Sequence, residues 1–307
     1  MISKPEFLLD ARADLAEGPA WAAASGLLYW IDIRVGWLHV FRPREKADMV
    51  FDLGESVGCV APRRSGGLVL GLRSGFALLD ALSFPRYFPQ KSDRPSARLE
   101  ALHLSNPEPH LPGNRFNDGK CDPAGRFLAG TMDDAEKQAC GSLYSLGPDG
   151  QVKTLLSGTR ISNGLAWSPD YHTLYFVDTP TRTIMMYDYA LTSGGISNPR
   201  PLLTIPAELG WPDGMTSDIE GMLWVAMWGG ARLTRWNPAT GKLVKEIPIP
   251  ALNVTSCVFG GPDMTDLYVT TARKDMDPDQ LWQYPLTGGL FRLQTNIHGM
   301  PTFEYGG

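Results

Sequence analysis

Four short motifs in this 307-residue chain place a carboxylate or an amide directly before a glycine, inside an apolar, strand-like stretch. They are LAEGPAW at 15–21, NRFNDGKCD at 114–122, ISNGLAW at 161–167 and WPDGM at 211–215. Asn-Gly and Asp-Gly pairs also form tight turns, so each motif alone is explained by a turn. All four, however, occupy the same phase of a repeat in four different units. That placement favours side chains that converge on one oxygen-rich metal site.

Histidine- and serine-based chemistry is less well supported. The five histidines have no zinc-type spacing such as H-x-x-x-H, so any metal is expected to be held by oxygen. The stretch GESVG at 54–58 matches the G-x-S-x-G pattern around Ser56. A nucleophile elbow needs a helix after its serine, whereas a strand and a turn are predicted here. We therefore interpret GESVG as part of a hairpin region.

An acidic turn near the C-terminus imitates the start of an EF-hand. Asp275, Asp277 and Asp279 have the spacing of the first three ligands. Gln280 stands where the loop needs glycine, and Leu286 where it needs glutamate. Flanking helices are also not predicted, so this segment is interpreted as a solvated turn.

The elements that must position the four motifs repeat along the chain. Six short β-type runs start 40, 59, 47, 49 and 44 residues apart, a spacing typical of propeller blades. Each run follows a turn rich in Pro, Asp, Gly or Ser. The runs are LYWID at 28–32, LVLGL at 68–72, FLAGT at 127–131, LYFVD at 174–178, LWVAM at 223–227 and LYVTT at 267–271. No stretch keeps a helical period, so we predict an all-β, six-bladed β-propeller.

The ring is expected to close with strands from both termini, because a closed ring leaves no free sheet edge. We predict that residues 5–21 and about the last 40 residues share one blade, and that residues 1–307 form a single domain. The interval 83–114 is unusual because it holds six prolines. It is predicted to be a long, partly extended loop on the face where ligands bind.

Composition narrows the classes of partner. The chain has 28 Lys+Arg against 33 Asp+Glu, a net charge of −5, and no basic run, which argues against nucleic acid or anionic membranes as partners. No signal peptide is expected, and no apolar stretch of 18 residues occurs in this sequence. The four cysteines are scattered without a C-x-x-C pair, which is typical of a reduced, cytoplasmic protein. We expect a monomer or weak oligomer that acts on a small molecule.

The motifs together resemble the SMP-30/gluconolactonase/regucalcin-like family of sugar-acid lactonases. The matching stretches run in family order over nearly the whole chain and include AEGPAW, NRFNDGKCDPAGRFLAGTM, ISNGLAWSPD, PDGM and DIEGMLWVAMWGG. The later part, from ALNVTSCVFGGPDMTDLYVTTAR onward, is similar to bacterial aldonolactonases. The resemblance implies a six-bladed propeller with one divalent metal ion in its central channel.

The resemblance also implies roles for individual residues. Glu17, Asn163 and Asp213 match the metal ligands, and all three are intact here. Arg115 and Asn117 match the substrate-contacting positions of the RFND motif. Glu136 lies in the variable stretch after GTM, where the match to the family is looser. It is a weaker candidate for a further substrate contact. The loop at 83–109 is longer than is usual in the family, which leaves substrate size open.

Two carboxylates and an amide suit Ca²⁺, Mg²⁺ or Mn²⁺, and less characteristically Zn²⁺. Such an ion polarises a lactone carbonyl, while Asp213 acts as general base toward water. The implied function is hydrolysis of an aldono-lactone to the aldonic acid. Two alternatives are a hydrolase of organophosphates or other esters with the same fold, and a non-enzymatic calcium-binding regulator.

Overall fold

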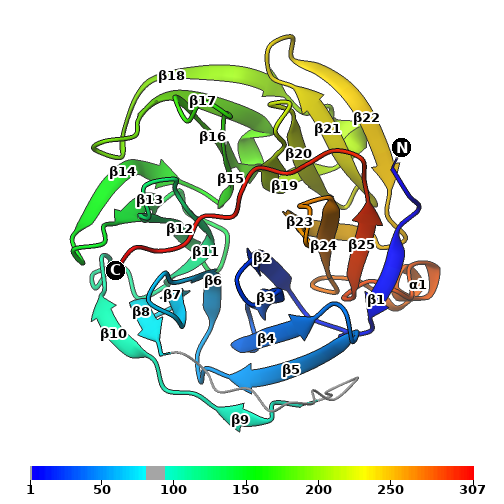
Figure 1. The fold of residues 1–307 in the computed structure, drawn as a ribbon, viewed down its shortest axis with the longest axis horizontal. Coiled ribbons are helices and arrows are strands. Elements are labelled where there is room, and N and C mark those ends of the chain that lie inside the picture. Colours follow the sequence, from blue (N-terminus) through cyan, green and yellow to red (C-terminus); the bar gives the residue numbers. More distant parts are fainter. Residues whose placement is uncertain (1, 81–93) are drawn as a thin grey trace.

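Six sheets surround a central axis in the computed structural model of this chain, which describes residues 2–80 and 94–307 (Figure 1). The predicted all-β, six-bladed propeller is confirmed. In each blade the first strand lies at the axis and the others follow outward. The sheets are antiparallel, except that β9 pairs with β5 in parallel.

From the axis outward, blade 1 consists of β2 (Ala16–Ala22), β3 (Leu27–Asp32), β4 (Trp37–Arg42), β5 (Ala47–Asp52) and β9 (Ala97–Arg98). Blade 2 consists of β6 (Val57–Pro62), β7 (Leu68–Leu72), β8 (Gly75–Leu79) and β10 (Leu102–Ser105). Blade 3 consists of β11 (Asn114–Cys121), β12 (Phe127–Asp133), β13 (Gly141–Leu146) and β14 (Val152–Thr159). Blade 4 consists of β15 (Ser162–Trp167), β16 (Thr173–Asp178), β17 (Thr183–Ala190) and β18 (Gly195–Thr204). Blade 5 consists of β19 (Trp211–Ser217), β20 (Leu223–Trp228), β21 (Arg232–Asn237) and β22 (Lys242–Pro248). Blade 6 consists of β23 (Asn253–Gly260), β24 (Asp266–Ala272), β25 (Leu290–Gln294) and β1 (Glu6–Leu9). The described helical segments are η1 (Thr179–Thr181), η2 (Ala207–Leu209) and α1 (Pro278–Gln283).

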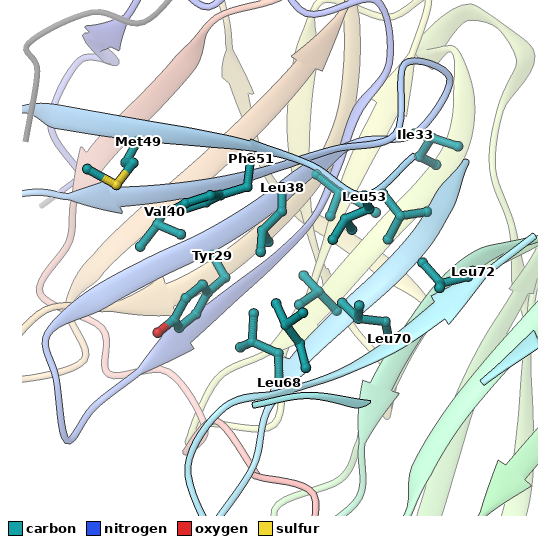
Figure 2. Packing of buried hydrophobic residues seen from close by; sticks show 14 of the residues in the cluster. Tyr29, Ile33, Leu38, Val40, Met49, Phe51, Leu53, Leu68, Leu70 and Leu72 are labelled. Carbon is teal, nitrogen blue, oxygen red and sulfur yellow. The ribbon is translucent and has the colours of Figure 1, made fainter. Parts of the chain in front are cut away.

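The six runs that revealed the repeat form the second strand of each blade: β3, β7, β12, β16, β20 and β24. Both faces of these strands are buried, so they read as nearly continuous apolar runs. Strand β7 illustrates the packing. Leu68, Leu70 and Leu72 point to one face and pack against Leu38 and other side chains of blade 1 (Figure 2). Each buried leucine contributes roughly 1.5–3 kcal/mol of transfer free energy.

The ring closes in blade 6, where β1 pairs antiparallel with β25 and Phe7 lies opposite Phe291. Closure by strands from both termini is therefore confirmed. The predicted extent was partly wrong, because only Glu6–Leu9 joins this blade. Residues 16–22 form β2, the innermost strand of blade 1, since their apolar run is buried along the axis.

The C-terminal segment leaves blade 6 and crosses one face of the ring (Figure 1). It is held by main-chain hydrogen bonds to three other blades, including Met300 N–H to Ser217 O (3.1 Å) and Tyr305 N–H to Pro62 O (2.8 Å). Met300 to Phe303 line a small cavity with the C-terminal ends of the inner strands. The segment thus covers that end of the central channel.

The long proline-rich interval is described in part, because residues 83–93 lie outside the described residues. The described remainder contains β9 and β10, which lie on the outer edges of blades 1 and 2 (Figure 1). Its position on a ligand-binding face stays a prediction. Residues 106–112 then return beside β11, where the buried Glu108 carboxylate accepts hydrogen bonds from Asn114, Thr131 and Tyr144.

The remaining sequence features have structural explanations. Asp277 caps α1 through a capping box with Gln280, so the EF-hand-like acids begin a short helix. All four cysteines are free thiols. Among the described residues, no helix has both the length and the apolar character needed to cross a membrane.

Candidate active site

One cavity of about 350 Å³ opens at the end of the channel opposite the C-terminal segment. This volume lies at the lower end of the range for small-molecule pockets. The cavity wall contains every residue selected from the sequence, namely Glu17, Arg115, Asn117, Glu136, Asn163 and Asp213. Ser56 and the histidines are not on the wall described for this cavity.

Register breaks in the innermost strands aim these side chains at the channel. Pairing of β2 with β3 shifts between Glu17 and Ala20, and that of β19 with β20 shifts between Pro212 and Met215. Similar shifts occur beside Asn117 in β11 and Asn163 in β15. A β-bulge bends its strand and redirects a side chain, so one extra residue per strand turns four motifs toward one point.

In three of the four motifs the glycine, which is Gly119, Gly164 or Gly214, permits this crowding. A Cβ on Gly214 would lie 2.2 Å from Ser256 Oγ of β23, and one on Gly164 would lie 2.6 Å from Asp213 O of β19. The interpretation of the motifs as simple turns is therefore wrong. Asn163-Gly164 and Asp213-Gly214 lie inside inner strands, where the missing side chain lets adjacent strands approach around the axis.

Glu17, Asn163 and Asp213 form an oxygen-rich cluster at the buried end of the cavity. Burial, with the nearby charges of Asp213 and Asp118, raises the pKa of Glu17 well above its usual value. Burial and Asp118 likewise raise the pKa of Asp213. Carboxylates placed together out of water favour protons or a cation as partners.

Two oxygens in this cluster fit a hard metal ion. Asn163 Oδ1 and Asp213 Oδ1 are buried without a hydrogen-bond partner. Asn163 donates through Nδ2 to Thr179 Oγ1 (3.1 Å), which fixes its amide with the oxygen free. No group of three His, Cys, Asp or Glu side chains suited to a metal occurs in the described part of the chain, so the amide would be needed as a ligand.

A buried pair lies further along the channel from this cluster. Lys120 Nζ donates to Met215 O on β19 (2.7 Å), and Asp118 accepts from the Gly119 N–H (2.7 Å). Burial raises the pKa of Asp118 and lowers that of Lys120, while each charge opposes the shift in the other. Lys120 and Asp118 thus each stabilise the charged form of the other away from water.

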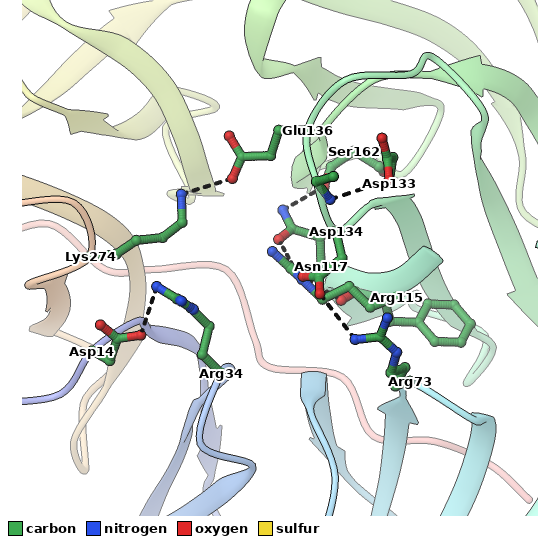
Figure 3. Close-up of polar contacts among 12 residues, drawn as sticks. Asp14, Arg34, Arg73, Arg115, Asn117, Asp133, Asp134, Glu136, Ser162 and Lys274 are labelled. Carbon is green, nitrogen blue, oxygen red and sulfur yellow. Dashed lines mark hydrogen bonds and ion pairs between the residues drawn. The ribbon is translucent and has the colours of Figure 1, made fainter. Parts of the chain in front are cut away.

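Arg115 is anchored by hydrogen bonds on three sides (Figure 3). Its Nε donates to Asp134 Oδ1 (2.7 Å), and its Nη1 donates to Phe116 O (3.0 Å) and to Asn117 Oδ1 (2.7 Å). Asn117 in turn donates to Ser162 O (3.0 Å) on β15. This network leaves Nη2 of Arg115 without a partner among the described residues.

Glu136 reaches the cavity from a loop organised by Asp133. The Asp133 carboxylate accepts from the N–H groups of residues 135, 137 and 138, which lowers the pKa of Asp133. Glu136 has a left-handed φ of 59°, uncommon outside glycine. Its carboxylate accepts a 2.8 Å hydrogen bond from Lys274 Nζ (Figure 3).

Several wall residues were not selected from the sequence, among them Arg160, Trp211, Trp228 and Lys274. Arg160 and Trp211 are next to or within selected motifs, so this proximity was the available signal. Trp211 is 40% exposed and stacks under the Arg182 guanidinium, whose Cζ is 3.5 Å from the ring centroid. Lys274 and Trp228 lie outside the four acid- or amide-glycine motifs, and only the ring arrangement brings them to the wall.

Comparisons with known proteins agree with this architecture. Residues 15–273 match the family model for the SMP-30/Gluconolactonase/LRE-like region. The chain is 38% identical over 304 residues to "Putative sugar lactone lactonase YvrE" of Bacillus subtilis, covering 97% of each chain. It is 37% identical over 310 residues to regucalcin of Oryctolagus cuniculus, covering 99% of each. A solved calcium-binding protein, regucalcin from Agrobacterium tumefaciens, superposes with a TM-score of 0.89 at 27% identity, covering 99% of this chain and 97% of that one.

Proposed function

The chain belongs to the SMP-30/gluconolactonase/LRE-like family, and we propose on this basis that it is a metal-dependent sugar lactone lactonase. The reaction proposed is hydrolysis of an aldono-lactone to the open aldonic acid. The observation that carries the proposal is the meeting of Glu17, Asn163 and Asp213, two of them with unpartnered buried oxygens, on one wall with Arg115 and Asn117.

Glu17, Asn163 and Asp213 would hold one divalent ion, for which Ca²⁺, Mg²⁺, Mn²⁺ and Zn²⁺ are the candidates. Bound there, such an ion would polarise the lactone carbonyl and stabilise negative charge on its oxygen. The donor set of two carboxylates and one amide is small. Loose metal selectivity and modest affinity are therefore expected.

The protein's own residues supply proton transfer and orientation. Asp213 is the proposed general base that takes a proton from the attacking water, in addition to its role as a ligand of the ion. Arg115 presents Nη2 to the sugar hydroxyls from a guanidinium that Asp134 and Asn117 already hold. Because these donors are fixed before binding, little orientation entropy remains to be lost.

The cavity wall supports a polyol substrate over a plain ester. Arg115, Asn117, Glu136 and Lys274 offer hydrogen-bond donors and acceptors, while Trp211 and Trp228 offer flat apolar faces. A site built to bond hydroxyl groups discriminates strongly against analogues that lack them. This feature distinguishes a sugar lactonase from an organophosphatase or general esterase.

A substrate panel in a pH-stat tests the proposal, because ring opening releases a proton. The panel contains δ-gluconolactone, δ-valerolactone (which has the same ring without hydroxyls) and the organophosphate paraoxon, each with and without divalent ions. We expect kcat/KM to be highest for gluconolactone and to depend on metal. A preference for paraoxon would establish the organophosphatase alternative. Calcium binding without turnover of any ester would favour the regulator.

A further inference from the structure

Arg160 differs from the other cations on the cavity wall. Three cationic side chains line the cavity: Arg115, Arg160 and Lys274. Arg115 is paired with Asp134, and Lys274 with both Glu136 and Asp275. Within residues 2–80 and 94–307, the Arg160 guanidinium has no carboxylate partner. Its recorded side-chain hydrogen bonds, from Nε (3.4 Å) and Nη2 (3.3 Å), are long and go to a single carbonyl, Glu136 O.

The backbone around Arg160 is fixed. The N–H groups of Arg160 and Ile161 donate to the Asp178 carboxylate at 3.1 and 2.9 Å, and Ile161 forms a bridge with Met132 of blade 3. The guanidinium therefore lies against the Glu136 loop from a rigid base. Its Nη1 has no hydrogen-bond partner in the described part of the chain. An exposed guanidinium with free N–H groups on a cavity wall is suited to receive an anion.

The position of Arg160 fits the far end of a bound sugar acid. It lies in the connection between β14 and β15, three residues before Asn163, and three residues of chain span at most roughly 11 Å. Asn163 is buried at the closed end of the cavity, whereas Arg160 is exposed at its mouth. A substrate whose carbonyl lies beside Asn163 and Asp213 would direct its opposite end toward Arg160.

The charges of the wall allow an extra anion. The three cations face four acids: Glu17, Glu136, Asp213 and Asp275. This set sums to −1, and the divalent ion of the proposed function would change it to +1. Glu136 and Asp275 both form ion pairs with Lys274. The positive charge available to a ligand at the mouth of the cavity is therefore that of Arg160.

We propose that Arg160 binds a second acid group on the substrate, so that the preferred lactone carries a carboxylate or phosphate at the end remote from its carbonyl. This inference rests on the proposed lactonase function. It names the lactones of sugar diacids and of phosphorylated sugar acids as the two substrate classes to compare. A guanidinium recognises both groups through paired N–H donors.

The test measures kcat and KM for three lactones: δ-gluconolactone, D-glucarolactone with its extra carboxylate, and δ-gluconolactone phosphorylated on its terminal carbon. The wild-type kcat/KM should be about tenfold higher for at least one charged lactone than for the neutral one. One charge-assisted hydrogen bond is expected to give a ratio of about this size. Arg160→Gln should reduce that ratio about tenfold through KM, and Arg160→Lys should restore part of it. The charged lactone whose kcat/KM falls more in Arg160→Gln identifies the acid group that Arg160 binds.

Arg44→Gln is the matched control. Arg44 is an exposed arginine in the turn between β4 and β5, at the periphery of blade 1, so its removal changes the net charge equally. It should leave the ratio as in wild type. No preference for either charged lactone in wild type, or a preference that survives in Arg160→Gln, would overturn the inference while gluconolactone turnover still supports the lactonase. Absence of turnover with all three lactones would overturn both.

Discussion

Nη1 of Arg115 donates a 2.7 Å hydrogen bond to Oδ1 of Asn117, two residues along the same inner strand. Phe116, the residue between them, pairs with Thr131, and Arg115 and Asn117 on either side of it both line the cavity, as alternate residues of a strand share a face. The two proposed substrate contacts are therefore one unit. Each side chain holds the other in position before any ligand binds.

This relationship predicts non-additive mutations. Arg115→Met and Asn117→Ala should each lower kcat/KM for a sugar lactone, but the double variant should lose little more than the worse single one. Residues in one hydrogen-bond network typically show coupling of about 0.5–3 kcal/mol. A double-mutant cycle of kcat/KM measures the coupling. Strictly additive losses would mean that the two residues act independently.

Asp134 predicts a pH dependence of substrate binding. Partial burial by itself raises the pKa of Asp134, but Arg115 and Arg73 outweigh it and leave the pKa below the usual value for aspartate. The ion pair with Arg115 is thus complete above the usual pKa, about 3.9, and is lost as the pH falls through the lowered one. Asp134→Asn should raise KM at pH ~6, where the wild-type ion pair is intact.

The decisive quantity is the ratio of the KM of Asp134→Asn to that of wild type, followed from pH ~6 to well below the usual aspartate pKa of about 3.9. It should shrink toward one as the wild-type carboxylate becomes protonated, because both proteins then lack the charge. This ratio cancels effects of acid on the rest of the site. A ratio that stays constant with pH would show that Asp134 does not support Arg115 through its charge.

The C-terminal segment predicts a stability change without a change in binding. Tyr305 is almost fully buried, packs in the cluster that contains Phe127 and donates from its hydroxyl to Gly147 O (2.8 Å). Tyr305→Phe should lower the free energy of unfolding by about 0.5–1.5 kcal/mol, and Tyr305→Ala by about 3–5 kcal/mol. Urea denaturation measures both losses. KM should not change, since this segment lies at the opposite end of the channel; a raised KM would contradict that separation.

The sequence predicted the ring because each blade repeats one apolar strand and one turn. LYFVD at 174–178 and LWVAM at 223–227 needed no tertiary information to be recognised as strands. The four acid- or amide-glycine motifs were found for the same reason. The conformation of these motifs could not be predicted, because Asn163-Gly164 has the composition of a turn. Only the crowding at the axis makes it a bulge.

Other features depend on contacts between distant segments. Lys274 reaches the cavity from the sixth blade and meets Glu136, which is 138 residues earlier in the chain. No local pattern encodes that meeting. The end of the chain was likewise unpredictable, because residues 300–305 form no long apolar strand and are positioned by main-chain bonds to other blades. Long-range order of this kind follows from ring closure and not from local propensity.

The most direct test of the proposed function is metal refilling of the chelated enzyme, followed by δ-gluconolactone hydrolysis in a pH-stat. Chelated wild type should be inactive and should recover when Mn²⁺ is returned in excess. Asp213→Asn should remain at least about a hundredfold slower after the same refilling, with an unchanged circular dichroism spectrum. Full turnover by the metal-free enzyme, or near wild-type turnover by refilled Asp213→Asn, would contradict the proposed mechanism.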